Sequence, residues 1–201
     1  MMSKSKAEKN KQNLKGANLQ GADFTGTNLM QANLRGANLM QANLNEAKLN
    51  GAKLIRADLT GADLTGTDLT GTDLTEAKLT DTNFTRAILI EAKLIRADLT
   101  GTNFTRANLM WVNLTLADLT GAIFTETKLM QAILIETNFT RANLMQTKLT
   151  EADLTRQTSC GRILRWQTSQ GQISLRQTSC RLISLRQISL EQISLEQISL
   201  G

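Results

Sequence analysis

Hydrophobic residues recur at every fifth position through most of the chain. From Leu14 to Leu154 each fifth position holds Leu or, at five places, Phe, which gives 29 positions in all. Two residues earlier the chain carries Ala in 19 repeats and Thr in eight, and only Gln12 and Val112 depart. The residue between is Asn in 12 repeats, Asp in eight, Lys in six and Ile in three. This period fits neither an amphipathic α-helix nor a long β-strand.

A five-residue unit does fit one short extended side followed by a corner. Residues two apart in an extended segment point the same way, so the Leu/Phe and the Ala/Thr are expected to face inward and the residue between them outward. All ten glycines of this region lie two residues after the Leu/Phe, where a tight turn favours their backbone freedom. The pattern therefore predicts a narrow tube, filled on each side by one large and one small side chain.

The repeated A(D/N)LXX unit resembles the motif of the pentapeptide-repeat family, and the match is unbroken through residues 12–156. The resemblance implies an all-β fold, a right-handed quadrilateral β-helix (a solenoid) with four pentapeptides in each coil. Twenty-nine sides then make about seven regular coils, or roughly 34 Å of rod at the usual strand spacing. We expect three regions: a basic, flexible segment at 1–12, the β-helix at 13–156 and a degenerate, less regular tail at 157–201.

Stacked coils would place residues 20 apart in columns. Phe84, Phe104 and Phe124 share one inward column and are expected to stack inside the tube. Several outward columns alternate in charge, and opposite charges on neighbouring coils attract, although each exposed pair contributes only about 0–1 kcal/mol. We interpret these columns as devices for register and solubility. They are Arg56–Glu76–Arg96, Glu136–Arg156, Lys53–Asp73–Lys93 and Asp58–Lys78–Asp98.

The residue types that catalysis needs are missing or are explained by the repeat. The chain has no His, which is the commonest general base and metal ligand, and also no Tyr or Pro. No nucleophile–base set, phosphate-binding loop or metal-ligand spacing occurs, and a filled tube offers no pocket. We therefore expect no catalytic, cofactor-binding or metal-binding residues, and no enzyme activity.

One outward region breaks the polar rule. Ile88 replaces the expected Asn or Asp, and Trp111 is the only aromatic residue of the repeats outside the Leu/Phe positions. Adjacent exposed apolar residues on successive coils are typical of an interaction site. Two interpretations stay open, namely drift of the repeat and a surface for a partner or a second copy. The candidate patch consists of Ile88, Ile90, Met110, Trp111 and Met130.

The formal charge of +5 belongs to the ends of the chain. Residues 1–12 carry four Lys and one Glu, residues 13–156 carry 14 Lys/Arg and 15 Asp/Glu, and residues 157–201 carry five Arg and two Glu. No apolar run follows the basic start, so it does not resemble a signal peptide, and no stretch is long enough to span a membrane. We expect a cytoplasmic protein in which Cys160 and Cys180 are reduced.

The first 12 residues have too little apolar surface to offset the entropy of ordering, so they are expected to be mobile or to form a short helix. They contain no convincing cap for the first coil. An uncapped coil presents an open β-edge, and such an edge favours pairing with another chain. Self-association through a coil end is therefore an expected contact.

These observations favour a non-enzymatic structural or protein-interaction rod whose partner the sequence does not name. The resemblance implies an alternative, because some family members resemble duplex DNA in shape and acidity, bind type II topoisomerases such as DNA gyrase, and so protect them from quinolones. That role needs dense negative charge. Here 15 acidic residues stand against 14 basic ones in the rod, and Lys takes six of the Asn/Asp positions. Nucleic-acid binding through the basic ends lacks interleaved aromatic residues.

Beyond Leu154 the five-residue period continues in a register shifted by one. Gln-Thr-Ser or Gln-Ile-Ser occurs seven times, starting at positions 157, 167, 172, 177, 187, 192 and 197. Codons for Gln-Ile-Ser-Leu, read one base earlier, can encode Ala, then Asp or Asn, then Leu, then Thr. We interpret residues 157–201 as a frameshifted reading of further repeats, with Cys160 and Cys180 as by-products. An irregular join is expected at about 156–172, followed by less regular β-like coils.

The frameshift interpretation makes a prediction about the gene. Bases after codon 154, translated in the frame one base earlier, should give Ala, then Asp or Asn, then Leu or Phe at five-residue spacing. Sequencing the gene and translating this frame is the check. Early stop codons, or the absence of such runs, would contradict the interpretation and make the tail a repeat in its own right.

Overall fold

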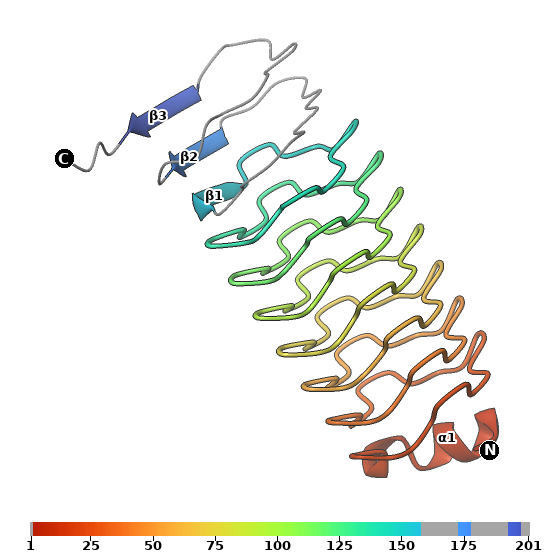
Figure 1. The fold of residues 1–201 in the computed structure, drawn as a ribbon. Helices are drawn as coiled ribbons and strands as arrows, with labels where there is room; N and C mark the ends of the chain where they lie inside the picture. Colours follow the sequence, from red (N-terminus) through yellow and green to blue (C-terminus); the bar gives the residue numbers. More distant parts are fainter. Residues whose placement is uncertain (1, 158–172, 178–192, 198–201) are drawn as a thin grey trace.

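A coil of 20 residues is the unit of the architecture. The structure is a computed structural model that describes residues 2–157, 173–177 and 193–197. Isolated parallel β-bridges join each outward residue to the one 20 positions later, from Asn18↔Asn38 to Ile133↔Asp153. Figure 1 shows these coils stacked above a helix at the N-terminal end. The expected register of four pentapeptides per coil is confirmed, whereas the total of about seven coils stays a prediction.

Every backbone N–H of a typical repeat finds an acceptor, as the repeat that starts at Asp58 shows. The N–H groups of Asp58, Leu59 and Gly61 donate to carbonyls of the neighbouring coils at 2.8–2.9 Å. The N–H of Ala62 closes the corner onto the carbonyl of Leu59 at 2.9 Å, and the N–H of Thr60 donates to Asp58 Oδ1 at 3.1 Å. Three of the five bonds connect coils, so sides too short to form ordinary strands still build a continuous ladder.

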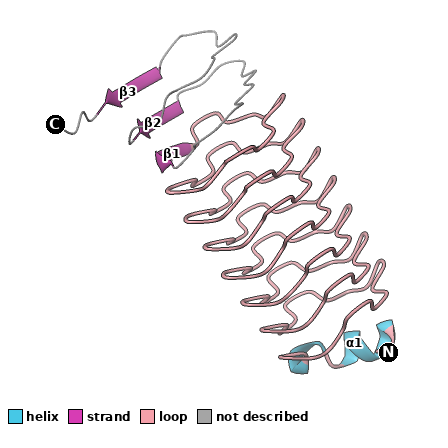
Figure 2. Cartoon of the chain, in the orientation of Figure 1, coloured by secondary structure: helices cyan, strands magenta, loops and turns pink. Residues whose placement is uncertain are grey.

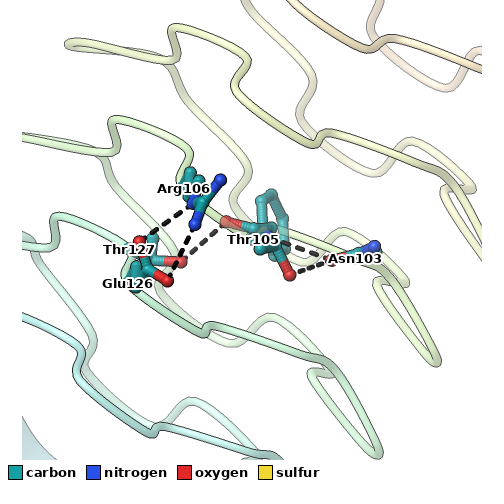
Figure 3. A network of polar contacts seen from close by, with 6 residues as sticks. Asn103, Thr105, Arg106, Glu126 and Thr127 are labelled. Carbon is teal, nitrogen blue, oxygen red and sulfur yellow. Dashed lines mark hydrogen bonds and ion pairs between the residues drawn. The ribbon is translucent and has the colours of Figure 1, made fainter.

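The polar residue before the Leu/Phe also holds the corner. In 17 of the described repeats this residue is Asn or Asp and its Oδ1 accepts the N–H of the residue after the Leu/Phe, at 2.9–3.3 Å. Where Thr follows, its hydroxyl usually donates to the same oxygen, as Thr105 does to Asn103 at 2.6 Å in Figure 3. Asn and Asp favour turns through such local bonds, which gives the recurring Asp-Leu-Thr and Asn-Phe-Thr runs a structural role.

Each corner is a turn whose second central residue has a positive φ. The ten corner glycines have φ between 61° and 70°, and 18 corner residues that are not Gly have φ between 54° and 61°. A positive φ at only the second central position is the geometry of a type II turn. The corner position of Gly is therefore confirmed. Most corners nevertheless hold a side chain in a conformation that costs roughly 1–2 kcal/mol relative to the right-handed form.

The inward positions form one continuous core. From Leu19 to Leu154 the inward Leu, Phe, Val, Ala and Thr side chains are at most 4% exposed. Phe84, Phe104 and Phe124 stack with ring centroids 5.1 and 4.9 Å apart and interplanar angles of 4° and 17°. The predicted aromatic run is thus confirmed.

Among the residues that the structure describes, seven buried threonines bond the coils together from the inside. Their hydroxyls donate to the carbonyl of the Leu or Phe 23 positions earlier, at 2.6–3.0 Å. Figure 3 shows one of them, Thr127. An eighth, Thr27, would reach back to Lys4, which belongs to the N-terminal helix and not to a coil. The Thr27 hydroxyl accordingly has no hydrogen-bond partner within the described part of the chain.

The N-terminal segment forms a short helix, as one of the two expectations had it. Helix α1 spans Lys4–Lys9, and a 3-10 turn, η1, follows at Lys11–Asn13. Figure 2 shows both helical pieces against the first coil. Ala7 is fully buried and belongs to the same core cluster as the coil interior. A single small side chain thus extends the core past its first coil.

Polar groups of this segment accept hydrogen bonds from N–H groups of the first coils, which have no preceding coil to donate to. In later coils the outward N–H donates to the preceding coil, whereas here Glu8 Oε1 accepts the N–H of Asn28 and the Lys11 carbonyl accepts that of Asn33, both at 2.8 Å. The expectation that the segment contains no cap is therefore wrong. The cap escaped prediction because it uses one Ala and scattered polar groups in place of an apolar run.

Lys4 fastens the cap to the first coil. Its Nζ donates to the carbonyl of Thr25 at 2.8 Å and lies 3.3 Å from Asp23 Oδ2. The pKa of Asp23 is lowered to about 2, first by the hydrogen bond from the Thr25 hydroxyl, then by that from the Thr25 N–H, with Lys4 adding to the effect. Because this pKa is below its ordinary value of 3.8, the carboxylate stabilises the folded end above that pH and loses the contribution as the pH falls toward 2.

Exposed ion pairs follow two of the predicted charge columns. Glu76 is held by Arg56 through a hydrogen bond that lowers its pKa, with the charge of Arg56 adding to it. A further pair, Arg106 with Glu126, was not among the predicted columns and appears in Figure 3. The Lys53–Asp73–Lys93 column is aligned by bridges, and the Arg156 side chain lies outside the described residues. The distances between the nitrogen and the carboxylate oxygen are 2.6 Å for Arg56–Glu76, 3.8 Å for Lys78–Asp58 and 2.9 Å for Arg106–Glu126.

In the described part of the tail, three parallel strands follow the regular coils in the order β1–β2–β3. Strands β2 and β3 pair residues 20 apart, from Ile173↔Ile193 onward. Strand β1 pairs with β2 at a spacing of 21 before a register shift restores a spacing of 20. The strands are β1 (Asp153–Gln157), β2 (Ile173–Gln177) and β3 (Ile193–Gln197).

The register shift lies between Thr155 and Gln157, where the sequence period also slips by one. Most of the tail, including Cys160, Cys180 and nearly all of the expected irregular join, lies outside the described residues. The frameshift and the division into segments 1–12, 13–156 and 157–201 therefore stay predictions.

The aromatic stack predicts a large and specific loss of stability. Phe104→Ala should lower the free energy of unfolding by about 3–5 kcal/mol because it opens a cavity between two rings. Phe104→Leu introduces the residue that most repeats already have, so it should cost less than about 1.5 kcal/mol. Urea denaturation followed by circular dichroism measures both. A cost below about 1 kcal/mol for the Ala variant would contradict the packing described.

Candidate protein-interaction face

The candidate patch occupies a corner and the side before it. Ile90, Met110 and Met130 lie in one corner column on successive coils and are half-buried. The N–H of Trp111 donates to the carbonyl of Met130 at 3.2 Å, so the Trp corner lies directly against the next coil. Ile88 is 37% exposed and belongs to the adjoining side. The structure thus brings Met110, Trp111 and Met130 together and leaves Ile88 around the corner.

Trp111 is the most exposed large apolar residue in the described part of the chain, at 47%. Its backbone has a φ of 57° at a corner where all other repeats except that of Leu116 place Gly or a polar residue. The indole Nε1–H donates to Gln131 Oε1, and Gln131 Nε2 donates to Glu151 Oε2 at 2.6 Å. These bonds fix the orientation of the ring while nearly half of its surface stays in contact with water.

Sequence reasoning missed two further residues of this surface. Leu116 is 40% exposed with a φ of 61°, and Ile133 is 38% exposed. Among the 18 corner residues with positive φ that are not Gly, only Trp111 and Leu116 are apolar. They lie five positions apart, at the two corners that bound one side. A comparison of the corner residues with one another would have found Leu116.

We call this surface the apolar side. On the next coil Ile133 lies at the centre of the same side, bridged to Asn113. The N–H of Leu116 donates to the carbonyl of Ile135 at 3.0 Å, which sets the second corner against the following coil. Ile123, Met30 and Met145 are also exposed, but they lie in other columns or on distant coils. The apolar side consists of Met110, Trp111, Leu116, Met130 and Ile133.

Charged residues flank the apolar side along the rod. The corner column that contains Leu116 has Arg96 one coil earlier and Glu136 one coil later. The outward column of Ile133 carries Lys93 on the N-terminal side and Asp153 on the C-terminal side. In these two columns positive charge precedes the apolar residues and negative charge follows them, whereas the corner column of Trp111 has Glu91 one coil earlier.

The described residues offer little else that could carry chemistry. They contain no group of three or more His, Cys, Asp or Glu side chains that could hold a metal ion. Seventeen outward Asp and Asn side chains are engaged in corners, as described above, and the resolved pKa shifts of the acids are all downward. A carboxylate with a lowered pKa is a poor general base near neutral pH. Within the described residues, no helix is both long and apolar enough to cross a membrane.

Several solved structures are similar to this chain. The full-length plasmid-mediated fluoroquinolone resistance protein QnrB1 matches with a TM-score of 0.63 at 20% identity, over 68% of this chain and 72% of that one. HetL, a pentapeptide-repeat protein involved in heterocyst differentiation regulation in the cyanobacterium Nostoc, matches at 29% identity over 78% and 82% of the two chains, with a TM-score of 0.40. A pentapeptide-repeat protein from the Arabidopsis thaliana thylakoid lumen is 36% identical over 57% and 69%, with a TM-score of 0.38.

The sequence comparison points the same way. No curated protein matches the chain. The family profile described as pentapeptide repeats matches in eight copies. The matched stretches are residues 13–45, 42–81, 67–106, 77–115 and 122–156. These segments cover more than half of the 201 residues. Together with the 20-residue coil, they show that this chain belongs to the pentapeptide-repeat family, whose fold is the right-handed quadrilateral β-helix.

Proposed function

We propose that this protein is a non-enzymatic rod that binds another protein through the apolar side. One observation carries the proposal: Trp111 and Leu116, both exposed and both at positive φ, occupy the two corners of a single side. The proposal includes the cytoplasmic location expected from the sequence.

The backbone conformation makes these two residues costly for the isolated rod. A left-handed conformation costs an L residue roughly 1–2 kcal/mol, and ten corners avoid that cost with Gly. A large apolar side chain at such a corner also leaves its surface in water, where burial would be favourable. A residue that keeps both an unfavourable backbone conformation and an exposed apolar side chain is a candidate for a functional role.

The composition of the apolar side suits protein recognition. Trp and Met are enriched in the cores of protein interfaces, and Trp is common among the residues that contribute most to binding. Trp111 is oriented by its bond to Gln131, so little freedom of the ring is lost on binding. Met110 and Met130 are half-buried beside it and can adjust to the shape of a partner.

Mimicry of DNA is the weaker candidate. The likeness to QnrB1, at 20% identity, concerns the fold. Phosphate mimicry requires dense negative charge, whereas residues 13–156 hold 14 basic and 15 acidic side chains. Several outward positions that could be acidic carry Lys, such as Lys48, Lys53 and Lys128. The rod therefore lacks the electrostatic field that this function depends on.

The proposal predicts that two corner substitutions remove binding without unfolding the rod. Trp111→Gln with Leu116→Gln introduces a residue that other corners already hold at positive φ, for example Gln131 and Gln146. In affinity capture from cell extract, the tagged full chain with both substitutions should recover at least about tenfold less of its specific partner than the wild type does, as expected when two anchors of this kind are removed.

The matched control is Arg86→Gln with Arg141→Gln, which changes two exposed corners elsewhere on the rod and should leave capture unchanged. Equal recovery of partners by both double variants and the wild type would contradict the proposed role of the apolar side. Inhibition of DNA gyrase supercoiling by the added protein would favour DNA mimicry instead.

A further inference from the structure

We propose that the partner of the apolar side is a second copy of this chain, packed face to face with the two rods antiparallel. This inference rests on the proposed function, because it accepts the apolar side as a protein-binding surface and names what binds there. It is carried by the columns that coil stacking imposes and by the charges at the two ends of the apolar side.

A two-fold axis across the apolar side, at the coil of Trp111 and Leu116, sets each column against the same column of the second copy in reverse order. Trp111 then faces Trp111 of the second copy, and Leu116 faces Leu116. Such an isologous contact is self-complementary only if the residues one coil before the axis match those one coil after it. The sequence of each column therefore tests the arrangement.

The corner column of Leu116 meets this condition. Arg96 lies one coil before Leu116 and Glu136 one coil after it, so Arg96 of each copy faces Glu136 of the other. Two equivalent ion pairs would then flank the apolar centre. In the corner column of Trp111, Glu91 faces the neutral Gln131, and no like charges meet within one coil of the axis.

The outward column between the two corners sets the length of the contact. Asn113 lies on the axis, and Lys93 faces Ile133 of the second copy, against which the aliphatic stem of the Lys can pack. One coil further out, Asp73 and Asp153 face each other with like charge. The favourable contact is therefore confined to the three central coils.

A parallel arrangement of the rods is disfavoured by the same column. It would set every residue of the outward column against its own copy, so that Lys93 faces Lys93 and Asp73 faces Asp73. Like charges directly opposite each other are destabilising. The charges thus select the antiparallel order.

The size of the contact implies a weak dimer. Three coils extend over only about 14 Å of the rod at the usual strand spacing. A face of this length is too short to bury the roughly 800 Å² per partner of a standard interface. We expect reversible association with a dissociation constant on the order of 100 µM.

Sedimentation equilibrium of the full chain, from about 10 µM to 1 mM, tests the inference by charge reversal. The wild type should approach a dimer at the upper end of this range. Arg96→Glu should weaken association at least about tenfold, because each of two facing pairs becomes repulsive. The double variant Arg96→Glu with Glu136→Arg should restore association to within about threefold of the wild type, because both facing pairs are rebuilt in reverse.

The control is Arg86→Glu, an exposed corner Arg with a φ of 59° in another column, which should leave association unchanged. Circular dichroism confirms that each variant is folded. A wild type that stays monomeric up to 1 mM, or a double variant that fails to recover, would overturn the antiparallel dimer. If the double variant Trp111→Gln with Leu116→Gln still loses a captured protein in that case, the proposed function stands and the partner is a different protein.

Discussion

The hydrogen bonds between coils are the interaction on which the rest of the structure depends. Three of the five N–H groups in a typical repeat donate to a neighbouring coil, so each coil fixes the register of the next. Because the spacing is 20 residues throughout the regular coils, a residue keeps the same direction as the others in its column. The core, the corners and the surface charges all follow from this single spacing.

Stacking of the coils gives the repetitive sequence flat faces, and each column of residues 20 apart gives its part of a face its own chemistry. Where the outward residue is Asn or Asp, it holds the corner and faces water, and such a face has little to offer a partner. The apolar side differs because Trp111 and Leu116 replace Gly or a polar residue at its two corners. The function proposed for this chain therefore depends on departures from the repeat and not on the repeat itself.

The five-residue period was enough to predict the inward residues, the aromatic stack and the Arg56–Glu76 pair, because each follows from residue spacing. It did not reveal Leu116. A comparison of the corner residues in the sequence would have found this apolar residue, but the positive φ that makes it costly is known only from the structure. The N-terminal cap was also missed, because Ala7 and the Glu8 carboxylate resemble an ordinary polar segment in sequence. Both features depend on how distant residues meet.

Amide hydrogen exchange measured by NMR in the repeat that begins at Asp58 tests the coil-to-coil ladder most directly. The N–H groups of Asp58, Leu59 and Gly61 donate to neighbouring coils, whereas that of Thr60 donates only to the side chain of its own repeat. The account predicts that the Thr60 N–H exchanges at least about tenfold faster than the other three, because it can open locally without separating coils. Equal exchange rates at all four positions would contradict it.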